Sequence, residues 1–531
     1  MNLVPLFFIP IGYLYIINNN ISYKQMGKFI SNFNTTAELA AFSATTEFRT
    51  PHLSLTKDNE KVHCFRRDYS QDYFTMVVTV GGDIKWSGST TANTLSYSKD
   101  DGDNWSAVTS ADTISVTAGD KVLWKGTPTP QSSYPNYGIG KFSGATDVRY
   151  SVEGNVMSLL YGDNFKGQTS LSGKNYALYS LFYGNTNVTS AENLSLLATT
   201  LADNCYYYMF FGCTNLTTAP SELPATTLTS YCYSSMFQGC TSLITAPQLL
   251  ATTLADNCYS NMFYNCKSLT TAPRLQATTL TTYCYSNMFN GCTSLMTAPQ
   301  LHATTLTTYC YSNMFNGCTS LTTAPELQAT TLAENCYREM FRGCTSLTTA
   351  PELLATTLAN YCYYGMFLGC TSLTTAPQLH ATTLANGCYN SMFEGCKSLT
   401  TAPELPSTAL TTYCYSAMFN NCTSLTTAPE LPATILASYC YYRMFKGCTS
   451  LTTAPQLQVT TLAEYCYNGM FSGCTSLNSI KCLATNISAS NCTTNWVSGV
   501  AASGTFTKAK SMTNWTTGKN GIPSGWTVVN A

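Results

Sequence analysis

The residues with the greatest capacity for chemistry in this chain are its 25 cysteines. Cys64 stands alone, whereas the other 24 lie between Cys205 and Cys492. Eleven pairs, beginning with Cys205/Cys213, share one internal spacing, and their first members recur every 26 residues from Cys232 onward. Such thiols can act as nucleophiles, bind a metal, form disulfides or pack as small hydrophobic side chains.

Catalysis and metal binding by these cysteines are both disfavoured by their sequence context. Zinc sites use closely paired ligands such as Cys-x-x-Cys, and the sequence contains no such pair. A nucleophilic thiol needs a nearby histidine base, and the chain has only four histidines for its 25 cysteines. His302 and His380 occupy equivalent places in two repeats, where Gln276 and Gln328 stand in others. We therefore predict no metal, no cofactor, no catalytic residues and no enzyme activity.

Disulfides and reduced buried thiols are the two remaining interpretations of the cysteines. Bridged cysteines need Cα atoms within about 7 Å. Stacked helices lie about 8–10 Å apart, and eight helical residues span about 12 Å, so most pairings are too long. A bridge from the first cysteine of one repeat to the second cysteine of the next stays open. We favour reduced thiols that pack as small hydrophobic groups.

The cysteines belong to a repeat of 26 residues. One complete unit, from Cys284 to Tyr309, reads CYSNMFNGCTSLTTAPQLHATTLTTY. A helical projection places the recurring bulky and sulfur-containing residues on one arc: Cys284, Tyr285, Met288, Phe289 and Cys292. The positions that vary between repeats fall on the opposite arc: Ser286, Asn287 and Asn290. This pattern predicts a short amphipathic helix that Gly291 ends. The following SLTTAP segment predicts a short strand that stops at Pro299.

A fixed period of 26 residues predicts a solenoid of stacked coils. The motif MFxGCxSLTxAPxL resembles the BspA-type leucine-rich repeat proteins of bacterial surfaces, over roughly residues 151–495. The fold class expected is an α/β repeat solenoid, leucine-rich-repeat-like, with one short strand and one short helix per coil. A small antiparallel β-sandwich domain is expected to precede it. The resemblance implies attachment to host proteins, glycans or other cells.

The solenoid is expected to need a cap at each end. Residues 151–204 are predicted to form the N-terminal cap with a degenerate repeat, in which Asn185 replaces the second cysteine. Eleven repeats then occupy residues 205–495, and residues 496–531 form a C-terminal β cap. The tail carries three tryptophans, for which we consider a hairpin covering the last coil or an exposed platform for sugars: Trp496, Trp515 and Trp526.

Residues 68–150 carry the strand signals of the predicted β-sandwich, at 73–80, 112–116 and 121–124. Within them, SKDDGDNW at 98–105 resembles the Asp-box turns of sialidase-type propellers. We interpret this single copy as a turn closed by Asp100, Gly102 and Trp105. Two alternatives are a calcium site and, more remotely, a carbohydrate-active enzyme. The calcium site would use three carboxylates: Asp100, Asp101 and Asp103.

The first 67 residues divide into two segments. Residues 1–25 contain an uncharged apolar run, which we interpret as an apolar leader or anchor, a mis-called start before Met26, or a folded element. Residues 26–67 predict a helix opened by a capping box at Thr35 and Glu38, then a hairpin around 57–60. This arrangement resembles N-terminal attachment segments of gut bacterial and bacteriophage structural proteins.

Charge and composition restrict the partners. Charged residues are 10% of the chain and the net charge is −1, so no basic surface is available for nucleic acid. We predict a non-catalytic, surface-exposed binding or adhesion protein that recognises a host protein, glycan or cell surface. Its location would be extracellular or on the cell surface, with membrane contact only through a possible N-terminal leader. The alternative is a bacteriophage virion protein, such as a tail fibre or a decoration protein.

The candidate binding face follows from the variable positions of the repeat. Exposed charged and aromatic residues at these positions are the side chains most able to contact a partner. The sequence places seven there: Arg338, Glu339, Arg342, Tyr364, Tyr442, Arg443 and Lys446.

Overall fold

The computed structural model describes five stretches of the chain: residues 53–58, 61–66, 68–88, 95–133 and 135–531. The chain divides into two compact units, Met1–Gln71 and Asp72–Ala531. In the first unit, β1 (Leu53–Asp58) pairs antiparallel with β2 (Lys61–Arg66), which confirms the predicted hairpin. The predicted leader and the predicted helix at Thr35 lie outside the described residues.

The second unit begins with two β-sheets, after a 3-10 turn η2 (Tyr69–Gln71) that precedes it. The larger sheet has the order β11-β10-β3-β8-β5-β6 and the smaller one β7-β4-β9, and every pair except β10–β11 is antiparallel. The strands are β3 (Phe74–Val80), β4 (Gly82–Gly88), β5 (Leu95–Ser98), β6 (Ser106–Val108), β7 (Thr113–Val116), β8 (Lys121–Gly126), β9 (Gly140–Gly144), β10 (Arg149–Asn155) and β11 (Val188–Ser195).

Aromatic side chains join these two sheets in one core. Trp124 of the larger sheet lies 4.8 Å from Phe142 of the smaller sheet, between ring centroids, and both rings are buried. Strand β7 alternates exposed and buried residues, and β8 buries every second one, because neighbouring side chains of a strand point to opposite faces. Strands β3, β7 and β8 lie where the sequence predicted strands.

Strand β9 of the sandwich closes the first end of the solenoid. The Phe142 N–H donates to the Leu181 carbonyl at 2.8 Å, and the Phe142 ring stacks on Phe182 at 5.7 Å. Phe182 stacks in turn on Phe210 of the first full coil at 5.1 Å. Asn185 Nδ2 donates to the Phe142 carbonyl at 2.9 Å. Phe142 therefore occupies the place that a preceding coil's phenylalanine would take.

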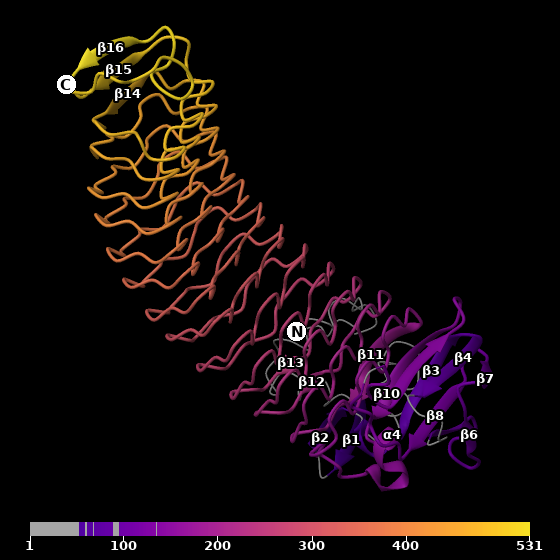
Figure 1. Cartoon of the computed structure of the whole chain (residues 1–531). Coiled ribbons are helices and arrows are strands. Elements are labelled where there is room, and N and C mark those ends of the chain that lie inside the picture. The colour runs from indigo at the N-terminus through magenta and orange to yellow at the C-terminus, as the bar shows by residue number, and fades with distance from the viewer. Residues whose placement is uncertain (1–52, 59–60, 67, 89–94, 134) are drawn as a thin grey trace, which may run out of the picture. The chain divides into compact units, whose positions relative to one another are not determined.

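The short helices and the parallel ladder link the sandwich to the coils. Among the described residues the one α-helix is α4 (Ser158–Tyr161), and the 3-10 helix η3 (Gly162–Phe165) follows it. Strands β10 and β11 are parallel, and a bridge between Ser190 and Thr218 carries this ladder into the repeats. The coils then stack from β11 towards β14 (Figure 1).

The predicted helix in each coil is not formed. The segment from Tyr283 to Cys292 is a chain of tight turns, with left-handed backbone at Tyr283, Asn287 and Gly291 (φ 56°, 55° and 75°). Alternate N–H groups bond within the coil and to the next coil. The Ser286 N–H donates to the Tyr283 carbonyl at 3.2 Å, and the Asn287 N–H donates to the Ser312 carbonyl at 2.9 Å.

The helical projection predicted most of the buried side chains of this segment correctly, although it predicted the wrong backbone conformation. Cys284, Met288 and Phe289 are buried as expected. Ser286 was placed on the solvent side, and this was wrong, because its side chain is 4% exposed and its hydroxyl donates to the Ser312 carbonyl at 3.4 Å. A left-handed residue at every fourth position has a period close to the 3.6 residues of a helix. Over nine residues the two patterns are nearly indistinguishable.

The extended half of each coil forms very short parallel pairings. Thr297 bridges to Thr323, and Leu301 bridges to Leu327, each in the following coil. Named strands occur in the two coils of β12 (Glu222–Leu223) and β13 (Gln248–Leu249), which pair with each other, and in the coil that begins at Cys466. The predicted strand is therefore present as pairing of one or two residues, shorter than expected.

Three parallel strands and a buried indole end the solenoid, and the first strand belongs to the last coil. They are β14 (Ser479–Cys482), β15 (Thr505–Lys508) and β16 (Thr527–Asn530). Trp496 is fully buried, lies 6.2 Å from Phe471 between ring centroids, and donates its indole N–H to the Gly521 carbonyl at 2.8 Å. The expected hairpin is wrong, since these strands run parallel. Trp526 is also buried, so these two indoles offer no exposed sugar platform.

Candidate functional site

The repeat cysteines are buried free thiols in the part of the chain that the structure describes with side chains. The second cysteine of a coil donates its S–H to a phenylalanine carbonyl in the preceding coil. Cys292 Sγ lies 3.0 Å from the Phe263 carbonyl oxygen, and Cys318 Sγ lies 3.1 Å from that of Phe289. Burial raises the pKa of the Cys310 thiol to about 12. These thiols stay protonated near neutral pH, so their role is packing.

The Asp-box segment forms a closed turn between β5 and β6. Asp100 accepts hydrogen bonds from the Ser98 hydroxyl at 2.6 Å and from the Asn104 backbone N–H at 3.0 Å. These hydrogen bonds lower the pKa of Asp100 to about 2. The Trp105 indole N–H donates to the Gly102 carbonyl at 2.9 Å. The predicted closure by Asp100, Gly102 and Trp105 is confirmed.

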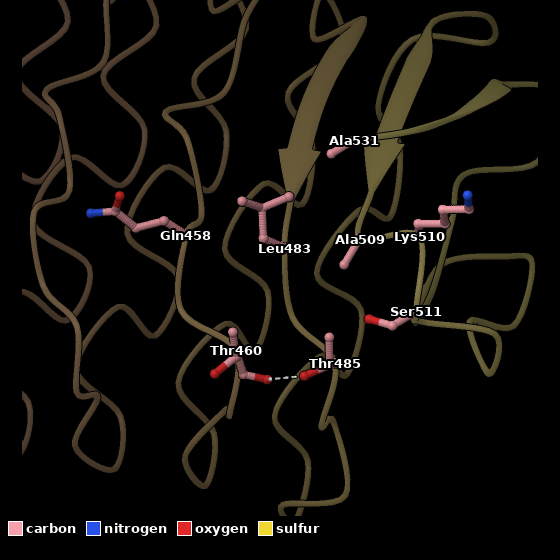
Figure 2. A pocket seen from close by; sticks show the side chains of 8 residues that line it. All are labelled: Gln458, Thr460, Leu483, Thr485, Ala509, Lys510, Ser511 and Ala531. Atoms are coloured by element: carbon pink, nitrogen blue, oxygen red, sulfur yellow. Dashed lines mark hydrogen bonds between the residues drawn. The ribbon is translucent and has the colours of Figure 1, made fainter.

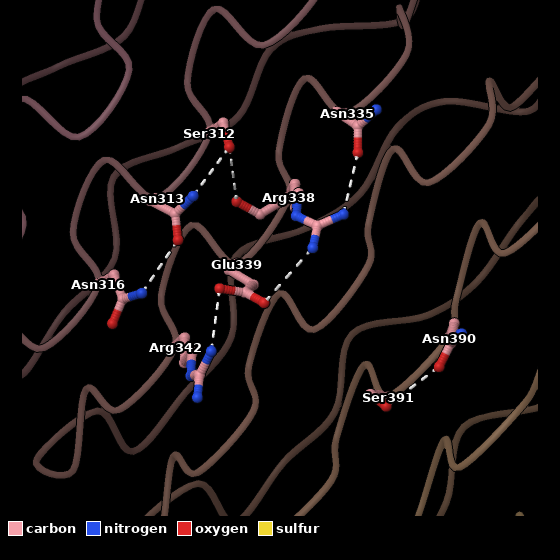
Figure 3. Close-up of polar contacts among 9 residues, drawn as sticks. All are labelled: Ser312, Asn313, Asn316, Asn335, Arg338, Glu339, Arg342, Asn390 and Ser391. Atoms are coloured by element: carbon pink, nitrogen blue, oxygen red, sulfur yellow. Dashed lines mark hydrogen bonds and ion pairs between the residues drawn. The ribbon is translucent and has the colours of Figure 1, made fainter. Parts of the chain in front are cut away.

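Four of the seven predicted face residues lie together on two neighbouring coils. Figure 3 shows Glu339 between two arginines, with Arg342 Nη1 3.1 Å and Arg338 Nη2 4.0 Å from its carboxylate oxygens. The Arg338 guanidinium lies 4.3 Å from the ring centroid of Tyr364 in the next coil. Arg342 is 47% exposed, whereas Glu339 is 13% exposed. In this cluster the guanidinium groups of Arg338 and Arg342 lie on either side of the largely buried carboxylate of Glu339.

The other three predicted residues lie on a coil further along the solenoid. The Arg443 guanidinium lies 4.8 Å from the ring centroid of Tyr442, and Lys446 follows on the same turn segment. Two coils, which begin at Cys388 and Cys414, separate this group from the first cluster. The structure therefore places the predicted face in two groups.

Rows of tyrosines were missed by the sequence reasoning. The residue that precedes the first cysteine of a coil stacks on its equivalent in the next coil. Tyr283 and Tyr309 lie 4.6 Å apart between ring centroids, and Tyr439 lies 4.5 Å from Tyr413 and 4.4 Å from Tyr465. The signal was present as a recurring tyrosine before cysteine. The helical projection began at the first cysteine of the coil and therefore left out the tyrosine that precedes it.

A shallow, open depression of about 680 Å³ lies between the last coils and the C-terminal strands (Figure 2). Two of its lining residues are joined, since Thr485 donates its hydroxyl to the Thr460 carbonyl at 3.4 Å. The side chains that line the depression offer hydroxyls, an amide and one lysine, and they supply no pair of carboxylates for glycoside hydrolysis. Among the described residues, no helix is long and apolar enough to cross a bilayer.

Comparison with known families identifies the repeat. The BspA type leucine rich repeat region matches the chain with six copies, over residues 179–296, 203–348, 256–399 and 356–494. Comparison with curated proteins gave no match. Repeats of this type generally occur in surface-associated binding or adhesion proteins and are generally non-enzymatic. The repeated aromatic and thiol core, the stacked coils and this match together show that the chain belongs to the family of BspA-type leucine-rich repeat proteins.

Proposed function

We propose that this chain is a non-catalytic, cell-surface adhesion protein that binds a protein on another cell through its turn row. The turn row comprises the side chains at the third, fourth and seventh positions of each coil, counted from its first cysteine. One observation supports this most directly. The turn backbone repeats the same hydrogen bonds in successive coils, while its side chains change from Ser286 and Asn287 to Arg338 and Glu339.

The chemistry of the turn row favours a protein partner. Arginine and tyrosine are enriched among the residues that dominate protein interfaces. Arg338 is already held against Tyr364 and Glu339, so less side-chain freedom is lost on binding. Tyr442 and Arg443 form a second, similar pair. Two ordered groups on one solenoid allow bivalent contact, which raises affinity when both engage the same partner.

The test measures adhesion of the labelled full chain to intact cells. A variant with Arg342→Ala and Arg443→Ala should bind about tenfold more weakly, because it removes an exposed cation from each group. A matched control, Lys267→Ala with Lys397→Ala, removes two exposed lysines outside the turn row and should bind normally. Protease treatment of the cells should abolish binding, and periodate oxidation of their glycans should not.

Two results would contradict the proposal. One is the absence of binding to every cell type tested. The other is equal binding by the arginine variant and the unmodified chain. The alternative of a bacteriophage virion protein rests on the N-terminal sequence, which lies outside the described residues, and it stays a prediction.

A further inference from the structure

Aromatic side chains are concentrated on the turn row of the first two coils. Five of the six positions there are aromatic, and we call this group the tyrosine platform: Tyr179, Tyr183, Tyr207, Tyr208 and Phe211. In the ten coils that begin at Cys232 to Cys466, three of thirty equivalent positions are aromatic. Most later coils fold with serine, asparagine or other side chains at these positions. The aromatic rings are therefore not required by the coil itself.

The platform borders a depression between the sandwich and the first coils. The depression has a volume of about 440 Å³, within the range of small-ligand sites. Tyr179, Tyr183 and Tyr208 line it together with Tyr137 of the loop before β9, whose ring lies 5.5 Å from that of Tyr179 between centroids. Tyr183 is 42% exposed, so its ring is accessible to solvent and to a ligand.

Ring contacts and the backbone hold the platform in place. Tyr207 stacks on Tyr208 at 3.9 Å, and Tyr183 stacks on Phe211 at 4.7 Å, between ring centroids. The Ser180 N–H donates to the Tyr207 carbonyl at 3.0 Å, which joins the two coils. A preorganised set of rings loses little conformational entropy on binding.

A loop of the sandwich that also lines the depression is attached to the same coils. Tyr137 stacks on Tyr176 at 4.7 Å. Gly138 and Gln131 exchange two backbone hydrogen bonds of 2.9 Å, which close the loop. The tyrosine platform and the loop that carries Tyr137 are therefore both held in place, by contacts with the folded coils or by the loop's own backbone.

The polar groups of the lining indicate the class of ligand. Asn136 and Ser180 supply an amide and a hydroxyl, and Lys141 is the one charged side chain among the residues that line the depression. A pyranose ring has an apolar C–H face that stacks on the electron-rich face of an aromatic ring, and hydroxyls around its edge that need such polar partners. A strongly anionic ligand would meet one lysine and several phenol faces.

We propose that the tyrosine platform and this depression form a binding site for a neutral glycan, with a pyranose ring stacked on the exposed ring of Tyr183 and its edge against Tyr208, whose ring is perpendicular to that of Tyr183. Asn136, Ser180 and Lys141 then hydrogen-bond to its hydroxyls. This site lies on the first two coils, apart from the two arginine groups on later coils. It takes a different class of ligand from the protein proposed to bind the two arginine groups of the turn row.

The experiment titrates the full chain with maltohexaose, cellohexaose and mannohexaose, and with a hyaluronan hexasaccharide as an anionic contrast. Isothermal titration calorimetry should detect at least one neutral hexasaccharide. The double variant Tyr183→Ala with Tyr208→Ala should weaken that binding about tenfold or more. Tyr183→Phe should retain it, because the ring face is kept.

Tyr264→Ala is the matched control, since Tyr264 holds the same turn-row position as Tyr183 two coils after the platform. Its affinity should equal that of the unmodified chain. Because Tyr183 is exposed, Tyr183→Ala alone tests the site even if the double variant is poorly folded. The proposal is overturned if no neutral hexasaccharide binds, if Tyr183→Ala binds normally, or if hyaluronan alone binds. The arginine variant should keep glycan binding, which separates this test from that of cell adhesion.

Discussion

At the scale of single residues, the cysteines are best explained by packing and by one weak hydrogen bond each for the second member of a pair. Cys292 is fully buried and donates its S–H to the carbonyl oxygen of Phe263 in the preceding coil. In the degenerate coil, Asn185 takes the equivalent place and donates to Phe142. The Phe263 carbonyl also accepts the backbone N–H of Cys266 at 3.0 Å, so the thiol of Cys292 supplies a second, weaker hydrogen bond to the other lone pair of that oxygen.

We therefore expect every repeat cysteine to be a protected thiol. Alkylation of the unfolded chain without reductant should add 25 adducts, and prior reduction should not change this number. The same reagent on the folded chain should leave the repeat cysteines unmodified, since they are buried. Intact-mass measurement gives both counts. A count that rises only after reduction would show that disulfides are present and would contradict this interpretation.

At the scale of the element, each coil contains a series of tight turns where a helix was predicted. These turns form backbone hydrogen bonds with the next coil. An isolated helix satisfies its backbone internally, whereas the Asn287 N–H needs the Ser312 carbonyl of the following coil. One coil alone therefore cannot satisfy its own backbone. Glycine and asparagine, which tolerate positive φ, occupy many of the left-handed positions, but Tyr283, Glu339 and Arg443 adopt the same conformation, so the hydrogen bonds between coils must impose it there.

Gly317 tests this account of the turn. Its φ is 72°, and a Cβ atom would find its nearest neighbour, in Gly291, at 3.7 Å, so space is available. Gly317→Val should destabilise the chain by about 1–2 kcal/mol, since a β-branched residue is strained in this conformation. Gly317→Asn should cost much less, because Asn421 holds the equivalent place in another coil with φ 60°. Urea denaturation measures both, and equal losses would refute the left-handed conformation.

At the scale of the whole molecule, the core is a pair of aromatic columns with thiols beside them. Phenylalanine rings of successive coils stack at 5.1–5.8 Å from Phe182 to Phe471. Phe142 continues the column at one end and Trp496 at the other. Stability therefore depends on contacts between neighbouring coils and on both end structures.

This core predicts loss of stability in alkali. Burial raises the pKa of Cys414 to about 11 and that of Cys310 to about 12, above the ordinary cysteine value of 9.0. Burial also raises the pKa of Tyr285 well above the ordinary tyrosine value of 10.0. Above pH 9 the unfolded chain releases protons that the folded chain keeps, so the free energy of unfolding falls as the pH rises. Each such thiol contributes a slope of up to about 1.4 kcal/mol per pH unit.

The urea midpoint should therefore be nearly constant from pH 7 to about pH 9 and fall steeply towards pH 11. Returning the sample to neutral pH should restore the midpoint, which separates titration from chemical damage. A midpoint that stays constant up to pH 11 would show that the thiols and phenols are not buried as described.

Repetition and residue type made several properties readable from the sequence. The 26-residue period indicated a solenoid, because identical coils bury identical side chains. Buried Cys284 and Met288, the strands near 73–80 and 121–124, and the Asp-box turn all followed from local patterns. The seven face residues were predicted as one binding face, and neither their division into two groups nor their contacts were predicted.

The sequence by itself determined which side chains recur inside each coil, since burial follows hydrophobicity and period. Tertiary structure alone decided the conformation of the turn segment, because half of its N–H groups bond to a coil 26 residues away. It also placed Ser286 inside, Phe142 against Phe182 before the first full coil, and Tyr137 in the same depression as Tyr183. These contacts join segments that are distant in the chain, and no local pattern encodes them.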